Sequence, residues 1–376
     1  MHLIALYQLW IIGACSGNAI ALHYGNQTRG GKTLIDKKLC SVRVGVVGCG
    51  YWGPKLIRNF QSIPGSDLHL VSDLREDRLE HIRGLYPGVE TTTDYNALLE
   101  SSVDAVALAT PVSTHFQMAR EALLHDKHVM VEKPLTRSSA EAEELIRLAE
   151  ERQRILMVGH TFEYNPAVEY LKDLIAKGSI GRVYYISATR VNLGIFQKDI
   201  NVIWDLAPHD ISILLYILGI KPNQVSARGA AYVQPRVEDV AHVTLHFPTG
   251  VMADIQVSWL DPCKTRRITV VGSQKMVVYD DVEPNEKIKI YDKGVDAPPY
   301  SDTLEEFRLS YRYGDITTPA ISGAEPLEIE CKHFLDCIRH GRAPRSDGHD
   351  GLHVVKVLEE AQLSLNDSGM PRTINW

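Results

Sequence analysis

The sequence lacks several features that would each fix a class of protein. Its six cysteines form no CxxC pair and no regular framework, so we expect neither a metal centre nor a disulfide-stapled fold, but a reducing compartment such as the cytoplasm. It also has no dense run of Lys and Arg, and its formal net charge is −7. This charge pattern argues against nucleic acid as a partner.

Long unbroken apolar runs are missing as well. The most apolar stretch, residues 3–22, has no Lys or Arg before it and is interrupted by Gln8, Ser16 and Asn18. Because a membrane-spanning helix needs roughly 18 consecutive apolar residues, we expect no membrane partner. We interpret residues 1–40 as a disordered or non-native extension.

What the sequence does contain is an alternation of strand-like and helical segments. Its 376 residues exceed one ordinary domain of roughly 100–200 residues, which suggests at least two. From residue 42, short β-branched runs alternate with helical stretches, which is the pattern of βαβ units. The runs are residues 42–48, 68–73, 103–109, 128–132 and 155–158. We therefore predict an α/β domain with a doubly wound parallel sheet over residues 41–163.

After residue 164 the pattern changes to one helix followed by alternating segments. The strand-like segments are residues 183–190, 224–233, 239–247, 251–259, 266–271, 275–280 and 287–291. They predict an α+β domain over residues 164–345 with a large, mostly antiparallel sheet. We interpret residues 295–326 as a loop and residues 328–340 as a helix. Residues 346–376 are expected to form a C-terminal helix that packs back on the first domain.

A glycine-rich turn follows the first predicted strand. Its sequence, from Gly48 through Cys49, Gly50, Tyr51 and Trp52 to Gly53, is a GxGxxG that opens a helix. The first glycine permits a tight turn, the second lets the backbone approach a diphosphate, and the third lets helix and strand pack closely. The diphosphate would lie at a helix N-terminus, which favours an anion. We predict a Rossmann domain that binds a dinucleotide, and we interpret Cys49 as a packing residue.

Further cofactor contacts are expected at the ends of the next strands. Asp73 can accept hydrogen bonds from ribose hydroxyls and would repel a 2′-phosphate, which favours NAD over NADP although Arg75 lies close by. Thr110 and Pro111 end another strand, at the carboxyl edge where open α/β sheets bind ligands. His115 follows; it is either a cofactor contact or a structural histidine.

Glu132 and Lys133 end the strand that precedes Pro134. The proline favours extended geometry at Lys133, and the strand end directs this side chain into the predicted cleft. A lysine beside an oxidised nicotinamide faces a cationic ring and partial burial, and both favour its neutral form. We predict that Lys133 takes part in proton transfer. We count Glu132 and Lys133 among the cofactor-binding residues.

A helix over residues 208–218 carries the second candidate group. Asp205 and His209 are four residues apart and share one side if the first turn extends that far back. Histidine is the side chain best suited to exchange a proton near neutral pH. The alternatives are that Asp205 is a helix N-cap and that His209 is a buried structural ring.

Taken together, the glycine loop, the Glu132-Lys133-Pro134 motif and the Asp205/His209 pair resemble the Gfo/Idh/MocA family. The resemblance covers nearly all of residues 42–376. It implies an NAD(P)-dependent dehydrogenase acting on CH–OH groups, with hydride transfer between a sugar or cyclitol carbon and a nicotinamide. Lys133 matches the family's EKP lysine, and Asp205 and His209 match its paired catalytic acid and histidine.

The substrate is less well defined by the sequence. Tyr164, Asn165, Arg190 and Asn192, together with His209, lie where the family builds its substrate pocket, and the guanidinium of Arg190 suits a phosphate or carboxylate. The stretch from Arg190 to Ile213 resembles bacterial members that oxidise UDP-N-acetylglucosamine-type sugars at C3. The alternatives are an inositol or free-sugar dehydrogenase and a non-catalytic NAD sensor or scaffold. We expect a homo-dimer or homo-tetramer, because a one-sided sheet leaves a face to cover.

Overall fold

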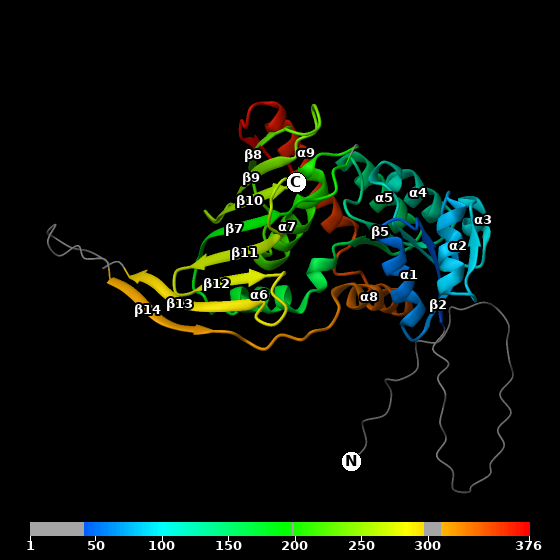
Figure 1. Cartoon of the computed structure of the whole chain (residues 1–376), viewed down its shortest axis with the longest axis horizontal. Helices are drawn as coiled ribbons and strands as arrows, with labels where there is room; N and C mark the ends of the chain where they lie inside the picture. The colour runs from blue at the N-terminus through cyan, green and yellow to red at the C-terminus, as the bar shows by residue number, and fades with distance from the viewer. Residues whose placement is uncertain (1–40, 198, 297–309) are drawn as a thin grey trace, which may run out of the picture. The chain divides into compact units, whose positions relative to one another are not determined.

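Two β-sheets organise the computed structural model of this chain (Figure 1). The structure describes residues 41–197, 199–296 and 310–376, so the prediction for residues 1–40 lies outside the described residues. None of the described helices is both long enough and apolar enough to span a bilayer.

The first sheet has six parallel strands in the order β3-β2-β1-β4-β5-β6. The strands are β1 (Val42–Val47), β2 (Ser66–Ser72), β3 (Glu90–Thr92), β4 (Ala105–Leu108), β5 (His128–Glu132) and β6 (Leu156–Gly159). The helices between them are α1 (Gly53–Ser62), α2 (Glu76–Leu85), α3 (Tyr95–Glu100), α4 (Val112–Leu124) and α5 (Ser139–Glu151). One apolar core joins α1 and α2 to the sheet and another joins α3, α4 and α5, so helices cover both faces. The predicted doubly wound sheet is confirmed.

The second sheet has nine strands in the order β14-β13-β12-β11-β7-β10-β9-β8-β15. All neighbours are antiparallel except β7 and β10. The strands are β7 (Val183–Val191), β8 (Gln224–Ala230), β9 (Val240–His246), β10 (Met252–Ser258), β11 (Thr265–Gly272), β12 (Met276–Asp280), β13 (Ile288–Asp296), β14 (Ser310–Thr317) and β15 (Arg372–Thr373). The predicted α+β class is therefore confirmed.

Alternation along these strands explains which face is covered. In β9 the side chains of Ala241, Val243 and Leu245 are buried, while those of His242 and His246 are exposed. Because successive residues of a strand point to opposite faces, only one face of the sheet lies in the core. That face packs under α6 (Pro166–Ala176), α7 (Val202–Leu218) and α9 (Gly348–Asn366).

The helix that carries Asp205 and His209 begins earlier than predicted. The side chain of Asn201 caps α7 by accepting a hydrogen bond from the N–H of Trp204, and Gly219 ends the helix in the left-handed conformation. Pro208 thus lies inside the helix rather than in its first turn. Asp205 is a helical residue and not the N-cap, which places it one turn before His209 on the same side.

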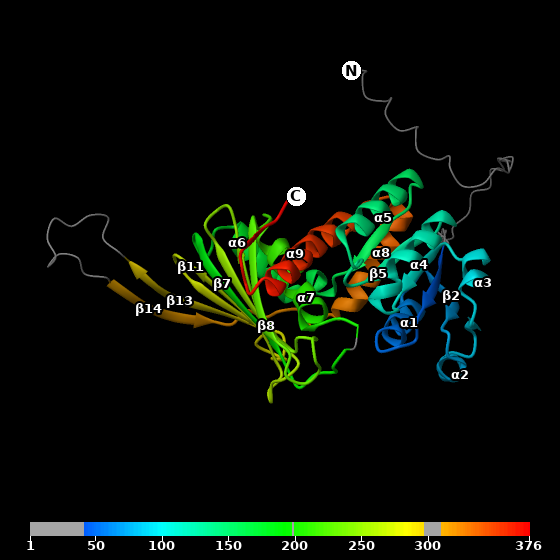
Figure 2. The same ribbon diagram turned by 90° about the horizontal axis from the view of Figure 1, so that it is seen from above.

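The C-terminal helices contact both sheets. Helix α8 (Pro326–His340) packs against α1 and β1, although the expected boundary at residue 345 assigned it to the second domain. Helix α9 contacts α5 and β6 on the side of the first sheet and α7 and β8 on the side of the second. Figure 2 shows it lying between α5 and the strands of the second sheet.

One local prediction was wrong. Residues 295–326 were expected to form a loop, but β13 continues to Asp296 and residues 310–317 form β14; residues 297–309 lie outside the described part. Strand β14 is an edge strand with mostly exposed side chains, so it lacks the apolar alternation from which a strand is recognised.

Candidate active site

The glycine loop connects β1 to α1 and has room for a diphosphate only at its middle glycine. Gly48 has a φ of +92°, and a Cβ there would lie 2.6 Å from the carbonyl oxygen of Ala109. A Cβ at Gly53 would lie 1.8 Å from the carbonyl oxygen of Gly48. A Cβ at Gly50 would have only the Arg78 guanidinium at 4.0 Å. The loop therefore fits a bound dinucleotide in the way that the motif predicts.

Asp73 lies directly beside this loop. One oxygen of its carboxylate accepts a hydrogen bond from the N–H of Cys49 at 2.6 Å, and the other accepts one from the N–H of Arg75 at 2.8 Å. Arg78 approaches the same carboxylate at 3.4 Å. Burial raises the pKa of the Cys49 thiol to about 12, which agrees with a packing role for that side chain.

The remaining predicted loop residues line the mouth of the site. Tyr51 is exposed, and the ammonium of Lys55 lies 3.6 Å from the centre of its ring and 4.2 Å from that of Trp52. Thr110 is half-buried and Pro111 is the exposed N-cap of α4. These residues stay accessible to a cofactor.

Lys133 follows β5, and its side chain contacts helix α7, which packs on the second sheet. Its ammonium donates to the backbone carbonyl of Asp205 at 2.7 Å and lies 3.4 Å from the carboxylate of the same residue. The indole N–H of Trp259 donates to the other carboxylate oxygen at 2.9 Å. Asp205 is thus fixed from two sides and in turn holds the end of Lys133.

His209 is half-buried on the next turn of α7. Its Nδ1 is buried and has no hydrogen-bond partner among the described residues, and the Phe162 ring packs edge-to-face with the imidazole, with centroids 5.1 Å apart. Burial lowers the pKa of His209 well below its usual value, and the charges of Lys133, Arg190 and Arg266 add to this shift. The imidazole is therefore neutral near pH 7 and can accept a proton.

Two further polar groups lie beside Lys133, and sequence reasoning did not assign either to proton chemistry. His160 follows β6 and is 1% exposed, with neither ring nitrogen hydrogen-bonded within the described residues. Burial, and next the charge of Lys133, lowers its pKa to about 3. Glu132 is also buried, and its Oε1 has no partner in the described part of the chain. Only their positions at the ends of adjacent parallel strands could have pointed to them.

Burial raises the pKa of Glu132 from 4.5 to about 7, which predicts a pH-dependent stability. The folded protein binds this proton more tightly than the unfolded chain, so this contribution to stability falls as the pH rises from about 4.5 to 7. In the cofactor-free protein, Glu132→Gln should therefore raise the free energy of unfolding by about 3 kcal/mol more at pH 8 than at pH 4.

Urea denaturation of wild type and Glu132→Gln at the two pH values measures this difference. Glu328→Gln is the control, because Glu328 lies on the exposed face of α8 in an ion pair with Lys332. A variant whose stability changes with pH as wild type does would contradict the assignment.

Four residues proposed from the sequence as ligand contacts have structural roles instead. His115 is 1% exposed, and its two ring nitrogens each lie 2.9 Å from a backbone carbonyl oxygen, Nε2 from that of Thr110 and Nδ1 from that of Pro134. Tyr164 is buried and hydrogen-bonded to Ser346. Each polar atom of these rings already has a partner, so neither ring is available to a ligand.

Arg190 and Asn165 are corrected for the same reason. The guanidinium of Arg190 makes two hydrogen bonds to the carboxylate of Asp210, at 2.7 and 3.0 Å, and both side chains are almost fully buried. The side chain of Asn165 caps α6 and donates to the hydroxyl of Tyr279 at 3.0 Å. Asn192, in contrast, is half-buried after β7 and remains a candidate substrate contact.

Two family models match the chain. One, described as "Oxidoreductase family, NAD-binding Rossmann fold", matches residues 42–160, and the other, "GFO/IDH/MocA C-terminal domain", matches residues 168–278. The boundary between these matches falls in the segment that contains η1 (Thr161–Tyr164), between the two sheets.

Individual relatives match over most of their length. The UDP-N-acetylglucosamine 3-dehydrogenase of Acidithiobacillus ferrooxidans is 28% identical over 332 residues, which is 86% of this chain and 97% of that protein. The myo-inositol 2-dehydrogenase of Thermotoga maritima is 27% identical, over 87% of this chain and 97% of that protein. A solved structure of the A. ferrooxidans enzyme superimposes with a TM-score of 0.72 at 26% identity, covering 87% of this chain and 99% of that one.

The matches span both sheets, and they coincide with the glycine loop and with the site formed by Lys133, Asp205 and His209. The chain therefore belongs to the GFO/IDH/MocA family of oxidoreductases. Residues 42–160, which contain the first sheet, match the NAD-binding Rossmann domain of that family.

Proposed function

We propose that this protein oxidises a secondary alcohol of a sugar, specifically C3 of a nucleotide-activated sugar, with NAD as hydride acceptor. The observation that carries the proposal is the meeting of Lys133, Asp205 and a neutral His209 at the carboxyl edge of the cofactor sheet. A hydroxyl bound there has an imidazole to receive its proton and an ammonium to polarise its oxygen. When bound, NAD supplies the carbon that accepts the hydride.

Each side chain has a distinct part in this proposal. His209 takes the hydroxyl proton, because burial and nearby cations keep its imidazole uncharged. Lys133 donates a hydrogen bond to the same oxygen or relays the proton. Asp205 positions Lys133, and Trp259 fixes the rotamer of Asp205.

The charge at the mouth of the site supports an anionic substrate. Arg266, near the start of β11, has a half-exposed side chain 3.5 Å from the carboxylate of Asp281 and acts electrostatically on both His209 and Tyr51, while Lys264, two residues earlier, is exposed. The pKa of Tyr51 is lowered, mostly by Lys55 and then by these two cations. Such a group of cations suits the diphosphate of a nucleotide sugar, whereas an uncharged inositol has no anionic group that these cations could bind. The 28%-identical relative that acts on UDP-N-acetylglucosamine agrees with this preference.

Absorbance at 340 nm tests the proposal, with NAD and a panel of UDP-N-acetylglucosamine, free sugars and inositols. We expect turnover with the nucleotide sugar and expect UDP alone to raise the Tm, since about 100 times the Kd of a ligand stabilises the fold by about 2.7 kcal/mol. Arg266→Ser should remove the protection by UDP. Arg267→Ser is the matched control, because the next residue of the strand points to the opposite face.

Other outcomes favour the alternatives. Turnover of an inositol or a free sugar without protection by UDP would indicate an inositol or free-sugar dehydrogenase. The similarity to a myo-inositol 2-dehydrogenase supports this alternative. NAD binding without turnover of any compound on the panel would indicate a sensor or scaffold.

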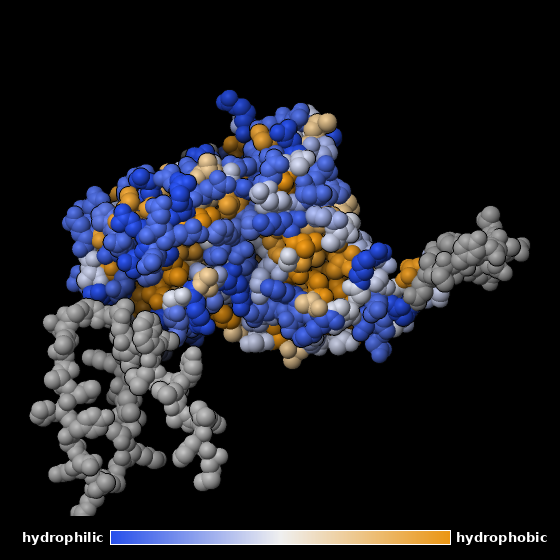
Figure 3. Space-filling model, turned by 180° about the vertical axis from the view of Figure 1, so that it is seen from behind, coloured by the Kyte–Doolittle hydropathy of each residue, from blue (hydrophilic) through white to orange (hydrophobic). Residues whose placement is uncertain are grey.

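We also propose that the chain forms a homo-dimer or homo-tetramer. Hydrophobic side chains reach the surface in patches between hydrophilic ones, as the view from behind shows (Figure 3). On the second sheet Tyr185, Met252 and Tyr313 are exposed, and large exposed apolar groups on a broad sheet favour burial by another subunit.

A further inference from the structure

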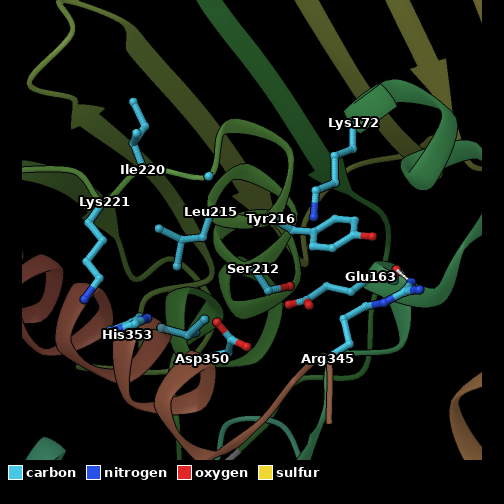
Figure 4. Close-up of a pocket in the computed structure, with 12 residues that line it drawn as sticks. Glu163, Lys172, Ser212, Leu215, Tyr216, Ile220, Lys221, Arg345, Asp350 and His353 are labelled. Carbon is cyan, nitrogen blue, oxygen red and sulfur yellow. Dashed lines mark hydrogen bonds between the residues drawn. The ribbon is translucent and has the colours of Figure 1, made fainter. Parts of the chain in front are cut away.

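A cavity of about 330 Å³ lies along helix α7, beyond the turn that carries His209 (Figure 4). It is lined by residues of η1, α6, α7, α9 and the segments that join them: Glu163, Lys172, Ser212, Leu215, Tyr216, Gly219, Ile220, Lys221, Arg345, Asp350, His353 and Val354. None of the proposed catalytic residues is among them. The cavity is therefore separate from the active site.

Glu163 is the polar group that marks this cavity as a site. Its side chain is 4% exposed, and its carboxylate forms no hydrogen bond and no ion pair with any described residue. Figure 4 shows this carboxylate pointing into the cavity, next to Ser212 and the carboxylate of Asp350. A buried carboxylate without a donor is costly, and a second carboxylate beside it adds repulsion. Burial and the nearby carboxylates raise the pKa of Glu163 well above its usual range, so a ligand that brings a positive charge would favour the ionised form of this acid.

A lysine faces the same cavity. The ammonium of Lys172 lies 3.5 Å from the centre of the Tyr216 ring and contacts no carboxylate within the described segments. Lys221 stands at the exposed rim in the same way, over the ring of Trp376. Arg345, in contrast, is paired with Glu169. The charges of Glu163 and Lys172 attract each other, but no hydrogen bond or ion pair joins the two side chains in the described part of the chain, so a molecule that carries both charges can contact each of them.

A divalent metal ion does not fit this arrangement. No group of three or more His, Cys, Asp or Glu side chains suited to a metal exists in the part of the chain that the structure describes. The nearby ammonium of Lys172 would also repel a compact dication.

We propose that this cavity binds a small zwitterionic amino acid, with its ammonium against Glu163 and Asp350 and its carboxylate against Lys172 or Lys221. The ligand would touch the helix that carries the catalytic histidine, since Ser212 donates a hydrogen bond to the carbonyl of His209 at 3.0 Å. Phe162, which packs on the His209 ring, is the neighbour of Glu163 in η1. The site is independent of which sugar the enzyme oxidises.

Isothermal titration calorimetry of the full chain tests this site with β-alanine, 4-aminobutyrate and 5-aminopentanoate, which differ in the separation of their charges. Butylamine and butyrate each carry one of the two charges and serve as ligand controls. We expect one of the zwitterions to bind at least about 10-fold more tightly than either single-charge compound, because two charge-assisted contacts replace one.

Two variants assign the binding to this cavity. Glu163→Gln keeps the size of the side chain and removes its charge, and Lys172→Met removes the opposite charge; each should weaken the zwitterion at least about 10-fold. Glu328→Gln on the surface of α8 should leave it unchanged. Far-UV circular dichroism verifies that each variant is folded. The proposal would be overturned if none of the three zwitterions bound at a concentration of about 20 mM, which is well above the roughly 1 mM Kd of a weak ligand. Binding that persists in both cavity variants would also overturn it.

Discussion

Replacing Lys133 by alanine is expected to lower kcat by about 10²–10⁴-fold while NAD binding is retained. The side chain is 9% exposed and ends 2.7 Å from the carbonyl oxygen of Asp205, so alanine removes an ammonium that the fold holds in one position beside α7. The glycine loop and Asp73 do not depend on this side chain, which is why cofactor affinity should survive. Steady-state kinetics on the best compound of the panel and NAD titration by fluorescence measure the two quantities.

His209→Ala should cause a similar loss, and the double variant should lose little more, because groups that act on one proton are not additive. Lys177→Ala is the control: Lys177 is exposed at the end of α6 and paired with Asp173. Wild-type turnover by both single variants would remove the proposed mechanism.

A second large effect is expected from Gly53→Ala. The added Cβ would meet the carbonyl oxygen of Gly48 at 1.8 Å, and that backbone atom cannot move without opening the loop. We expect the free energy of unfolding to fall by about 3 kcal/mol, the upper range for overpacking, and NAD binding to be lost with it.

The matched control for this substitution is Gly84→Ala in helix α2. A Cβ at Gly84 would have no heavy atom within 4 Å, so the same chemical change should raise stability by up to about 1 kcal/mol through helix propensity. Chemical denaturation and NAD titration of both variants compare them directly. If Gly53→Ala bound NAD as wild type does, the loop would not be the cofactor site that we describe.

The features behind these predictions differ in how easily they can be recognised from the sequence. The glycine loop is local: six consecutive residues specify a turn, a close approach and a helix start, so its structure could be read without knowing the fold. Lys133, Asp205 and His209 could be assembled only through a resemblance, because the contact between Lys133 and Asp205 spans 72 positions of the chain.

Polar side chains with internal partners were the main source of error. The sequence alone does not indicate whether an arginine binds a phosphate or a buried carboxylate, because only the fold brings Arg190 to Asp210. The histidine at position 115 was ambiguous for the same reason. The orphaned oxygen of Glu132 depends on burial by the surrounding fold, a condition that no local pattern records.

Helices α8 and α9 have a consequence for the order of events during synthesis. The first sheet leaves the ribosome early, yet α8 packs on its β1 side and α9 contacts α5 and β6. These two helices span residues 326–366, which are translated well after the first sheet and its own helices. The nascent nucleotide-binding half must therefore keep part of its apolar surface uncovered until residues 326–366 have been made.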